Sequence, residues 1–209
     1  MLGLLLAPLL ALAQDPVAPE PAPAPAPANV PNVAVGHLAP GFALPTLNQK
    51  VTTALVGSGT IALSDFTGVQ PRLASKVVVL TFVRRADGDA PLRELQRVHR
   101  KYNKRGVEVV AIVGGGGTIA ETSSWIQTLD LSFPVAFDAY DVVVGRYGVR
   151  EWPLTVIVDG QATLVKDKAD GKAPPRSADD NGDVLALGTG AKGLASEIDV
   201  LLESLVTTP

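Results

Sequence analysis

The chain of 209 residues contains no cysteine, which excludes every reaction that begins at a thiolate. Neither thiol–disulfide exchange nor cysteine-based peroxide reduction is available, because both start with attack by ionised sulfur. Histidine is also scarce: His37 and His99 are the two present, and they lie too far apart to have the spacing of zinc ligands. We therefore expect each histidine to be a surface or loop residue, and we expect no metal or other cofactor.

Blocks of basic residues are absent as well. The formal net charge is −3, from 18 Lys and Arg against 21 Asp and Glu, with no strongly charged stretch of either sign. A nucleic-acid-binding surface needs clustered positive charge, so we expect no nucleic-acid partner. The length suits one folded domain with extensions.

The N-terminus is apolar and is followed by a proline-rich segment. Residues 1–13 carry no charged side chain and end with Ala11 and Ala13, small residues typical of signal-peptide cleavage, here before Gln14. The apolar run is shorter than the roughly 20 residues of a membrane-spanning helix. Residues 14–34 are mostly Pro and Ala and predict an extended spacer. We therefore expect an exported protein, periplasmic or extracellular, without stable membrane insertion after cleavage.

Residues 35–206 alternate between buried-strand and amphipathic-helix patterns, as expected for the folded domain. Three continuous runs of β-branched and other apolar residues predict strands buried on both faces: residues 77–83, 107–113 and 154–158. Asp159-Gly160 is a strong turn pattern and predicts a hairpin with a partner strand at residues 162–166. The polar residues 167–183 predict a long loop.

Helical patterns follow the first two strands. The first predicted helix has Asp89 as its N-cap and is closed by Gly106. The second begins with the capping box of Thr118 and Glu121, and Trp125 lies on its apolar face, which predicts a core position. Two more helical segments are expected, at residues 141–147 and 194–205. Strands joined by crossover helices run parallel, so this order predicts an α/β fold with a central mixed sheet flanked by helices on both faces.

Several short motifs occur in a recognisable order. They are V-G-H-L-A-P-G-F-A-L-P at residues 35–45, I-A-L-S-D-F-T-G at 61–68, L-T-F-V-R at 80–84, L-R-E-L at 92–95 and G-V-R-E-W-P-L-T-V-I-V-D-G at 148–160. Together they resemble the thioredoxin-like superfamily, and within it the alkyl hydroperoxide reductase/thiol-specific antioxidant (redoxin) branch. The resemblance covers residues 35–167 and implies a thioredoxin-like fold with oxidoreductase or antioxidant activity.

The resemblance also implies two cysteines, separated by two residues, at the start of the first helix. Asp87-Gly88-Asp89-Ala90 stands at those positions, with Asp87 and Ala90 in place of the cysteines. An aspartate can hold a negative charge at the N-terminal end of a helix, but it cannot be oxidised or attack a peroxide. The chain is therefore similar to a member of the family that has lost its catalytic residues.

Trp152-Pro153 stands at the position of the family's cis-proline. Trp152 replaces a residue that is usually small or β-branched, and Leu154 replaces a frequent Thr. An exposed Trp152 would be a binding anchor, whereas a buried one would fill space left by the missing cysteines. We expect any binding groove to lie between residues 87–90 and this proline.

Four charged residues lie near the start of the first predicted helix, and each of them has two interpretations. Asp87 and Asp89 could form an acid/base pair or a weak cation site, or serve as a loop residue and a helix cap. Arg84 and Arg85 could bind an anion together with the helix N-terminus, or pair with the two aspartates.

Two further segments suggest ligands but are better explained as loops. Residues 114–117 are four glycines that match no complete phosphate-loop pattern, so we expect a flexible loop. Residues 179–183 are rich in Asp, but Gly190 stands where a calcium loop needs its closing Glu, so we expect a solvated loop.

Three functions are consistent with these observations. The first is a redox-inactive module that binds another envelope protein or a peptide, or acts as a scaffold. The second is the oxidoreductase or antioxidant activity that the resemblance implies, which would need an external thiol or a bound cofactor. The third is a structural role tethered by the Pro/Ala spacer.

Overall fold

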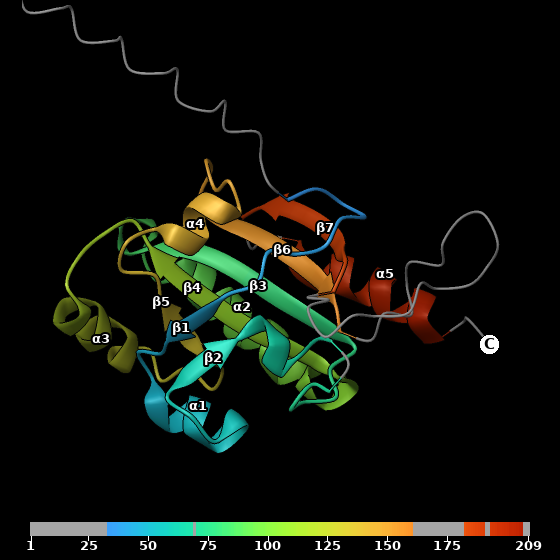
Figure 1. The fold of residues 1–209 in the computed structure, drawn as a ribbon, viewed down its shortest axis with the longest axis horizontal. Coiled ribbons are helices and arrows are strands. Elements are labelled where there is room, and N and C mark those ends of the chain that lie inside the picture. Colours follow the sequence, from blue (N-terminus) through green and yellow to red (C-terminus); the bar gives the residue numbers. More distant parts are fainter. Residues whose placement is uncertain (1–32, 69, 161–181, 191–192, 207–209) are drawn as a thin grey trace, which may run out of the picture.

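A mixed sheet forms the centre of the molecule in the computed structural model, which describes residues 33–68, 70–160, 182–190 and 193–206 (Figure 1). The five strands lie in the order β5-β4-β3-β6-β7. Their bounds are Val77–Arg84 for β3, Val107–Gly114 for β4, Val135–Phe137 for β5, Leu154–Asp159 for β6 and Val184–Thr189 for β7. A smaller antiparallel sheet pairs β1 (Ala43–Pro45) with β2 (Thr60–Ala62).

Strand directions confirm the predicted mixed sheet. β3 runs parallel to β4, and β4 runs parallel to β5. β6 is antiparallel to both of its neighbours, β3 and β7. The three strands predicted from continuous apolar runs are β3, β4 and β6, and β3 is buried along nearly its whole length because helices cover both faces of the sheet.

The predicted partner of β6 is wrong. Residues 162–166 were expected to pair with β6 through a tight turn at Asp159-Gly160. One edge of β6 instead pairs with β3 and the other with β7, so both of its edges are occupied by other strands. Residues 162–166, like most of the predicted loop at 167–183, lie outside the described residues. A turn-forming dipeptide thus marks where a strand ends without fixing which segment returns beside it.

Five α-helices are described: α1 (Gln49–Val56), α2 (Ala90–Tyr102), α3 (Ile119–Thr128), α4 (Val142–Arg146) and α5 (Leu194–Val206). Short 3-10 turns are η1 (Leu63–Asp65), η2 (Arg85–Asp87) and η3 (Asn103–Arg105). All the predicted helices are present, whereas α1 was not predicted. No helix within the described ranges is long and apolar enough to cross a membrane.

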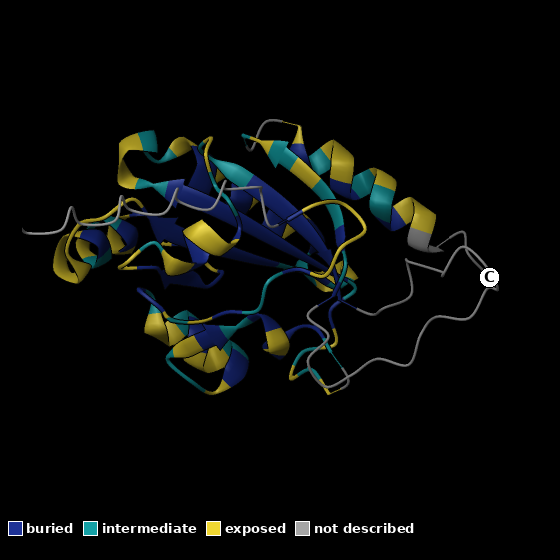
Figure 2. Cartoon of the chain, turned by 45° about the horizontal axis from the view of Figure 1, so that its top comes forward, coloured by how far each residue is buried: buried dark blue, intermediate teal, exposed yellow. Residues whose placement is uncertain are grey.

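Each face of the sheet has its own hydrophobic core. On one face, Leu92 of α2, Ile126 of α3 and Ile198 of α5 belong to the same core as the apolar side chains of β3 and β4. On the other, the rings of Phe82 and Tyr147 pack in a tilted arrangement with their centroids 4.8 Å apart. Figure 2 shows the buried strands between helices that expose their outer sides. The predicted α/β fold, a central mixed sheet with helices on both faces, is confirmed.

The ends of the helices follow their capping residues. The predicted capping box of α3 is confirmed: the Glu121 amide donates to Thr118 Oγ1 at 3.3 Å, and the Thr118 amide donates to Glu121 Oε2 at 3.4 Å. α2 ends at Tyr102, and η3 then leads to Gly106, whose φ of 85° lies in the left-handed region. The expectation that His99 is a surface or loop residue is wrong, because it lies on α2 one helical turn after the buried Leu95 and is 8% exposed.

Candidate functional site

A groove of about 690 Å³ lies at the N-terminal end of α2. Asp87 and Ala90, from η2 and the start of α2, and Trp152 and Pro153, from the segment before β6, are among the residues that line it. The Trp152-Pro153 peptide bond is cis. The remaining lining residues come from the first turns of α2 and from the turn between β7 and α5: Pro91, Arg93, Glu94, Arg97, Gly190 and Gly193. The fold therefore brings together the segments between which a groove was expected.

Asp87 points back toward β3. It ends η2, and its carboxylate accepts hydrogen bonds from the Arg84 backbone amide at 2.7 Å and from an Arg84 guanidinium nitrogen at 3.0 Å. Its side chain is 11% exposed. The carboxylate at the position of the family's first cysteine is thus already occupied by partners from its own chain, and it is not a free base.

Asp89 occupies the N-cap position of α2, but its side chain makes no capping hydrogen bond. Its carboxylate accepts a hydrogen bond from Trp125 Nε1 at 2.9 Å and pairs with Arg93 at 3.3 Å. The Trp125 hydrogen bond, followed by Arg93, lowers the pKa of Asp89. Asp87 and Asp89 therefore have separate partners, and the structure does not combine them into an acid/base pair or a cation site.

The two adjacent arginines have different surroundings. Arg84 pairs with Asp87, as one of the two readings predicted. Arg85 forms no ion pair with either aspartate, because Asp89 pairs with Arg93 instead. Arg85 is exposed on η2 and lies near enough to Glu121 to contribute to the lowering of the pKa of that carboxyl, after the hydrogen bonds from Thr118.

Trp152 is neither fully exposed nor fully buried. The Arg84 guanidinium carbon lies 5.0 Å from the centroid of its ring, a cation–π distance. Its other contacts include the core on the Phe82 side of the sheet. Trp152 is therefore fixed from behind while part of its surface remains open to the groove.

Two glycines allow this stack, and the sequence pattern did not indicate it. A Cβ at Gly114 would lie 3.3 Å from Trp152 Cη2 and 2.6 Å from a Val144 methyl carbon. A Cβ at Gly115, which has a φ of +81°, would lie 2.7 Å from Arg84 Cγ. The first half of the glycine run thus serves close packing around Arg84 and Trp152.

The groove holds no sulfur and its charged groups are paired. The charged residues that line it form three ion pairs: Asp87 with Arg84, Arg93 with Asp89, and Glu94 with Arg97. No cluster of metal-ligating side chains is found in the part of the chain that the structure describes. Residues 179–181 of the Asp-rich segment lie outside it. The arrangement can bind a ligand, but it offers no nucleophile.

Comparisons with known proteins agree with this geometry. The profile of the AhpC/TSA family matches residues 35–166. The thiol-disulfide oxidoreductase ResA of Bacillus thuringiensis subsp. konkukian is 26% identical over 137 residues, covering 64% of this chain and 68% of that protein. ResA of Oceanobacillus iheyensis is 31% identical over 126 residues, 59% of each chain.

Solved structures show the same fold. A crystal structure of a thiol:disulfide interchange protein DsbE from Chlorobium tepidum is similar with a TM-score of 0.58 and 24% identity, covering 81% of this chain and 99% of that one. A solution structure of a thioredoxin from Neisseria meningitidis has a TM-score of 0.55 and 16% identity, covering 81% and 91%. At these identities the likeness establishes the thioredoxin-like fold alone.

Proposed function

This chain belongs to the AhpC/TSA family, and we propose that it is a redox-inactive member that binds a partner in the groove beside Trp152. The observation that carries the proposal is that the groove persists without any residue able to do thiol chemistry. Its relatives are thiol-disulfide oxidoreductases, and that chemistry needs cysteine. What this chain has is a groove without thiols and an aromatic side chain, Trp152, among the residues that line it.

The stacking of Trp152 supports a binding role. Aromatic side chains fixed before binding lose little conformational freedom when a partner docks, and tryptophan is among the residues that contribute most to interfaces. Arg84 holds one side of the ring, and Asp87 holds Arg84. The chain of contacts from Asp87 to Trp152 thus acts as a positioning device for the ring.

The proposed occupant is an extended segment of another envelope protein. The hydrogen-bonded ladder between β3 and β6 ends at the pair Phe82 and Leu154, so the backbone at Trp152 lies beyond the last pair. Gly190, whose amide donates to the Pro153 carbonyl at 2.8 Å, and Gly193 also line the groove, and their lack of side chains lets a second backbone approach. Since the acids and bases of the groove are paired with one another, an uncharged or amphipathic segment suits it better than a highly charged one.

The envelope location rests on the sequence. The apolar residues 1–13 and the Pro/Ala-rich residues 14–34 have the composition of a signal peptide and a spacer. Cell fractionation and N-terminal sequencing of the purified protein test this part. A mature N-terminus at Gln14 in the periplasmic or extracellular fraction would support export, and a cytoplasmic protein that begins at Met1 would contradict it.

Site-specific photocrosslinking tests the groove. A photoreactive amino acid at Arg93, an exposed residue of the lining, is expected to give a discrete adduct with an envelope protein in the bacterium that encodes this chain. The same probe at Val200, which is 67% exposed on α5, is the matched control and should give none. Trp152→Ala is expected to abolish the adduct. Equal adducts from both positions, or an adduct unaffected by Trp152→Ala, would contradict the proposal.

Oxidoreductase activity is the second candidate, because the similar proteins described above are thiol-disulfide oxidoreductases. It requires electrons to pass through an external thiol or a bound cofactor, since the chain supplies no sulfur from cysteine. Disulfide and peroxide reduction assays with thioredoxin or dithiothreitol as donor separate the two candidates. Turnover above the uncatalysed background favours the enzyme, and background rates favour the binding module.

A further inference from the structure

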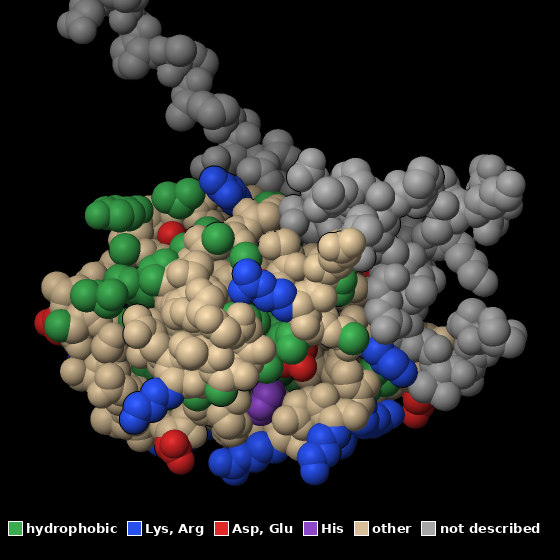
Figure 3. Space-filling model, turned by 60° about the horizontal axis from the view of Figure 1, so that its bottom comes forward, with side chains coloured by type: hydrophobic (Ala, Val, Ile, Leu, Met, Phe, Trp, Pro, Cys, Tyr) green, Lys and Arg blue, Asp and Glu red, His purple; other side chains and the backbone are tan. Residues whose placement is uncertain are grey.

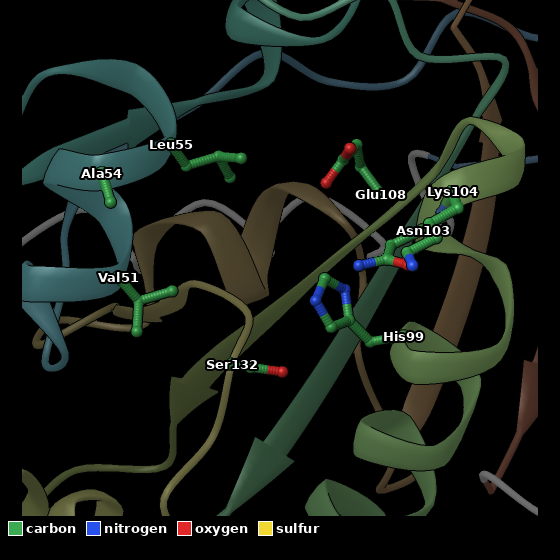
Figure 4. Close-up of a pocket in the computed structure, with 8 residues that line it drawn as sticks. All are labelled: Val51, Ala54, Leu55, His99, Asn103, Lys104, Glu108 and Ser132. Atoms are coloured by element: carbon green, nitrogen blue, oxygen red, sulfur yellow. Dashed lines mark hydrogen bonds between the residues drawn. The ribbon is translucent and has the colours of Figure 1, made fainter.

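A second cavity lies at the C-terminal end of α2, away from the groove, and the proposed function does not use it. Its volume is about 480 Å³, which falls within the range of small-molecule sites. α1, the end of α2, η3 and the beginning of β4 surround it. Figure 4 shows the side chains that line it.

The sheet topology explains why this cavity is open. β5 pairs only with Ala111–Val113 at the far end of β4. Within the described sheet, the first half of β4 therefore has no strand beside it on that side. Glu108 lies in this first half, at an edge that a longer β5 would have covered.

The two walls of the cavity differ in chemistry. Val51, Ala54 and Leu55 of α1 form an apolar wall. Glu108 of β4 and His99 of α2 lie across from them, and Figure 4 shows both side chains directed into the space between. The space-filling view, turned so that the bottom of Figure 1 with α1 comes forward, shows hydrophobic side chains among Lys and Arg side chains (Figure 3). An elongated ligand with one polar end matches this pair of walls.

Glu108 has no partner among the described residues. None of the hydrogen bonds or ion pairs found there involves its carboxyl group, and the side chain is half-buried. Burial raises the pKa of Glu108, with no nearby charge to offset the effect. A half-buried carboxylate without a counterion is unfavourable, so a cation that reached it would be bound.

His99 is also incompletely satisfied. It is 8% exposed, and its Nδ1 atom is buried without a hydrogen-bond partner in the described part of the chain. Burial is the main cause that lowers the pKa of His99 and favours the uncharged imidazole, with a further contribution from Arg100, while a hydrogen bond with the Ser132 backbone acts in the opposite direction. The only positive side chain in the lining is Lys104, which is exposed and forms no ion pair with Glu108 among the described residues.

We propose that this cavity binds a small aliphatic primary ammonium ion, with the ammonium group on the Glu108 carboxylate and the hydrocarbon chain against Val51, Ala54 and Leu55. The carboxylate supplies the charge and the α1 wall supplies apolar contact. His99 adds a neutral polar surface beside the ammonium group without repelling it. The proposal concerns a site separate from the groove, and it stands or falls independently of the binding function assigned there.

Ligand titration tests the charge requirement. The full 209-residue chain is titrated with n-hexylammonium chloride, and the backbone amide shifts of α1 and β4 are followed by NMR. Hexylammonium is expected to shift amides around Leu55 and Glu108, whereas 1-hexanol and sodium hexanoate at the same ionic strength should bind at least about tenfold more weakly. Equal affinity for hexanol or hexanoate, or shifts confined to the groove, would overturn the proposal.

Two variants test the two walls separately. Glu108→Gln should weaken hexylammonium binding about tenfold or more, since a charge-assisted contact is lost. Glu197→Gln, which removes an exposed carboxylate on α5, should leave binding unchanged. Butylammonium should bind more weakly than hexylammonium by about fourfold per buried methylene, and Leu55→Ala should reduce that difference. Thermal unfolding confirms that each variant is folded, and unchanged binding by folded Glu108→Gln contradicts the site.

Discussion

The two ends of α2 differ in how their charged side chains are balanced. At the N-terminal end, Asp87, Asp89 and Glu94 each pair with an arginine. At the C-terminal end, neither Glu108 nor His99 Nδ1 has a hydrogen-bonding partner among the described residues. The end that resembles a redox site thus has three paired carboxylates, although Arg84 Nε is buried there without a hydrogen-bond partner among the described residues, while the end without any recognised motif has a carboxylate without a partner. The family resemblance locates the position of the redox site, whereas the polar groups without partners locate the proposed cavity site, which has no sequence motif.

The largest effect on stability is expected from Asp87→Ala. The variant removes the acceptor of both the Arg84 amide and its guanidinium, and leaves a part-buried donor without a partner. The free energy of unfolding should fall by about 2 kcal/mol in urea titrations. Glu94→Gln is the control: its partner Arg97 is 76% exposed, so the change should stay within about 0.5 kcal/mol. Equal effects of the two variants would show that Asp87 is not a structural partner of Arg84.

Glu108→Gln is expected to change the free energy of unfolding in the opposite direction, toward greater stability at neutral pH. The raised pKa of Glu108 means that the folded state holds this proton more tightly than the unfolded state, so the wild type loses stability as the pH rises from about 4.5 through the raised pKa. The glutamine variant has no such loss and should be the more stable protein at neutral pH. Unfolding curves at pH 4 and pH 7 measure the difference. A wild type that is more stable than the variant at pH 7 would indicate an unrecognised partner for Glu108.

Asp89→Asn is expected to have the smallest effect. Its carboxylate is exposed, and an asparagine oxygen can still accept the hydrogen bond from Trp125 Nε1. The lowered pKa of Asp89 gives a stabilising contribution that is present above about pH 4 and is lost as the pH falls through the folded-state value. The variant should therefore lack this part of the acid-induced loss of stability. Trp125 fluorescence followed from pH 5 to pH 2 provides the measurement, and identical profiles would contradict the assignment.

Much of the fold was predictable because its strongest patterns are local. β3, β4 and β6 are continuous apolar runs, and the capping box of Thr118 and Glu121 marks the start of α3. α1 was missed because its Val and Thr residues favour strands and its preceding Asn48 does not cap it. Asn48 instead donates to the Phe133 carbonyl and accepts from the Val135 amide.

The features that could not be predicted from the sequence depend on contacts between segments far apart in the chain. β7 is a partly exposed strand, and neither its own sequence nor that of β6 indicates that the two strands pair. For the groove, motif spacing placed Asp87, Ala90, Trp152 and Pro153 together, but not the direction of each side chain. The cavity at Glu108 and His99 left no motif at all, because it results from a short β5 and from α1 lying across the sheet edge.

Disulfide reduction by two forms of the chain tests the central claim most directly: the redox architecture remains, but a carboxylate stands in place of the nucleophile. Reduction of insulin disulfides is measured with dithiothreitol as donor, for the wild type and for the double variant D87C/A90C. The wild type is expected to give only the dithiothreitol background, and the double variant, with two thiols at the start of α2, is expected to exceed it. Wild-type turnover above background would contradict the account.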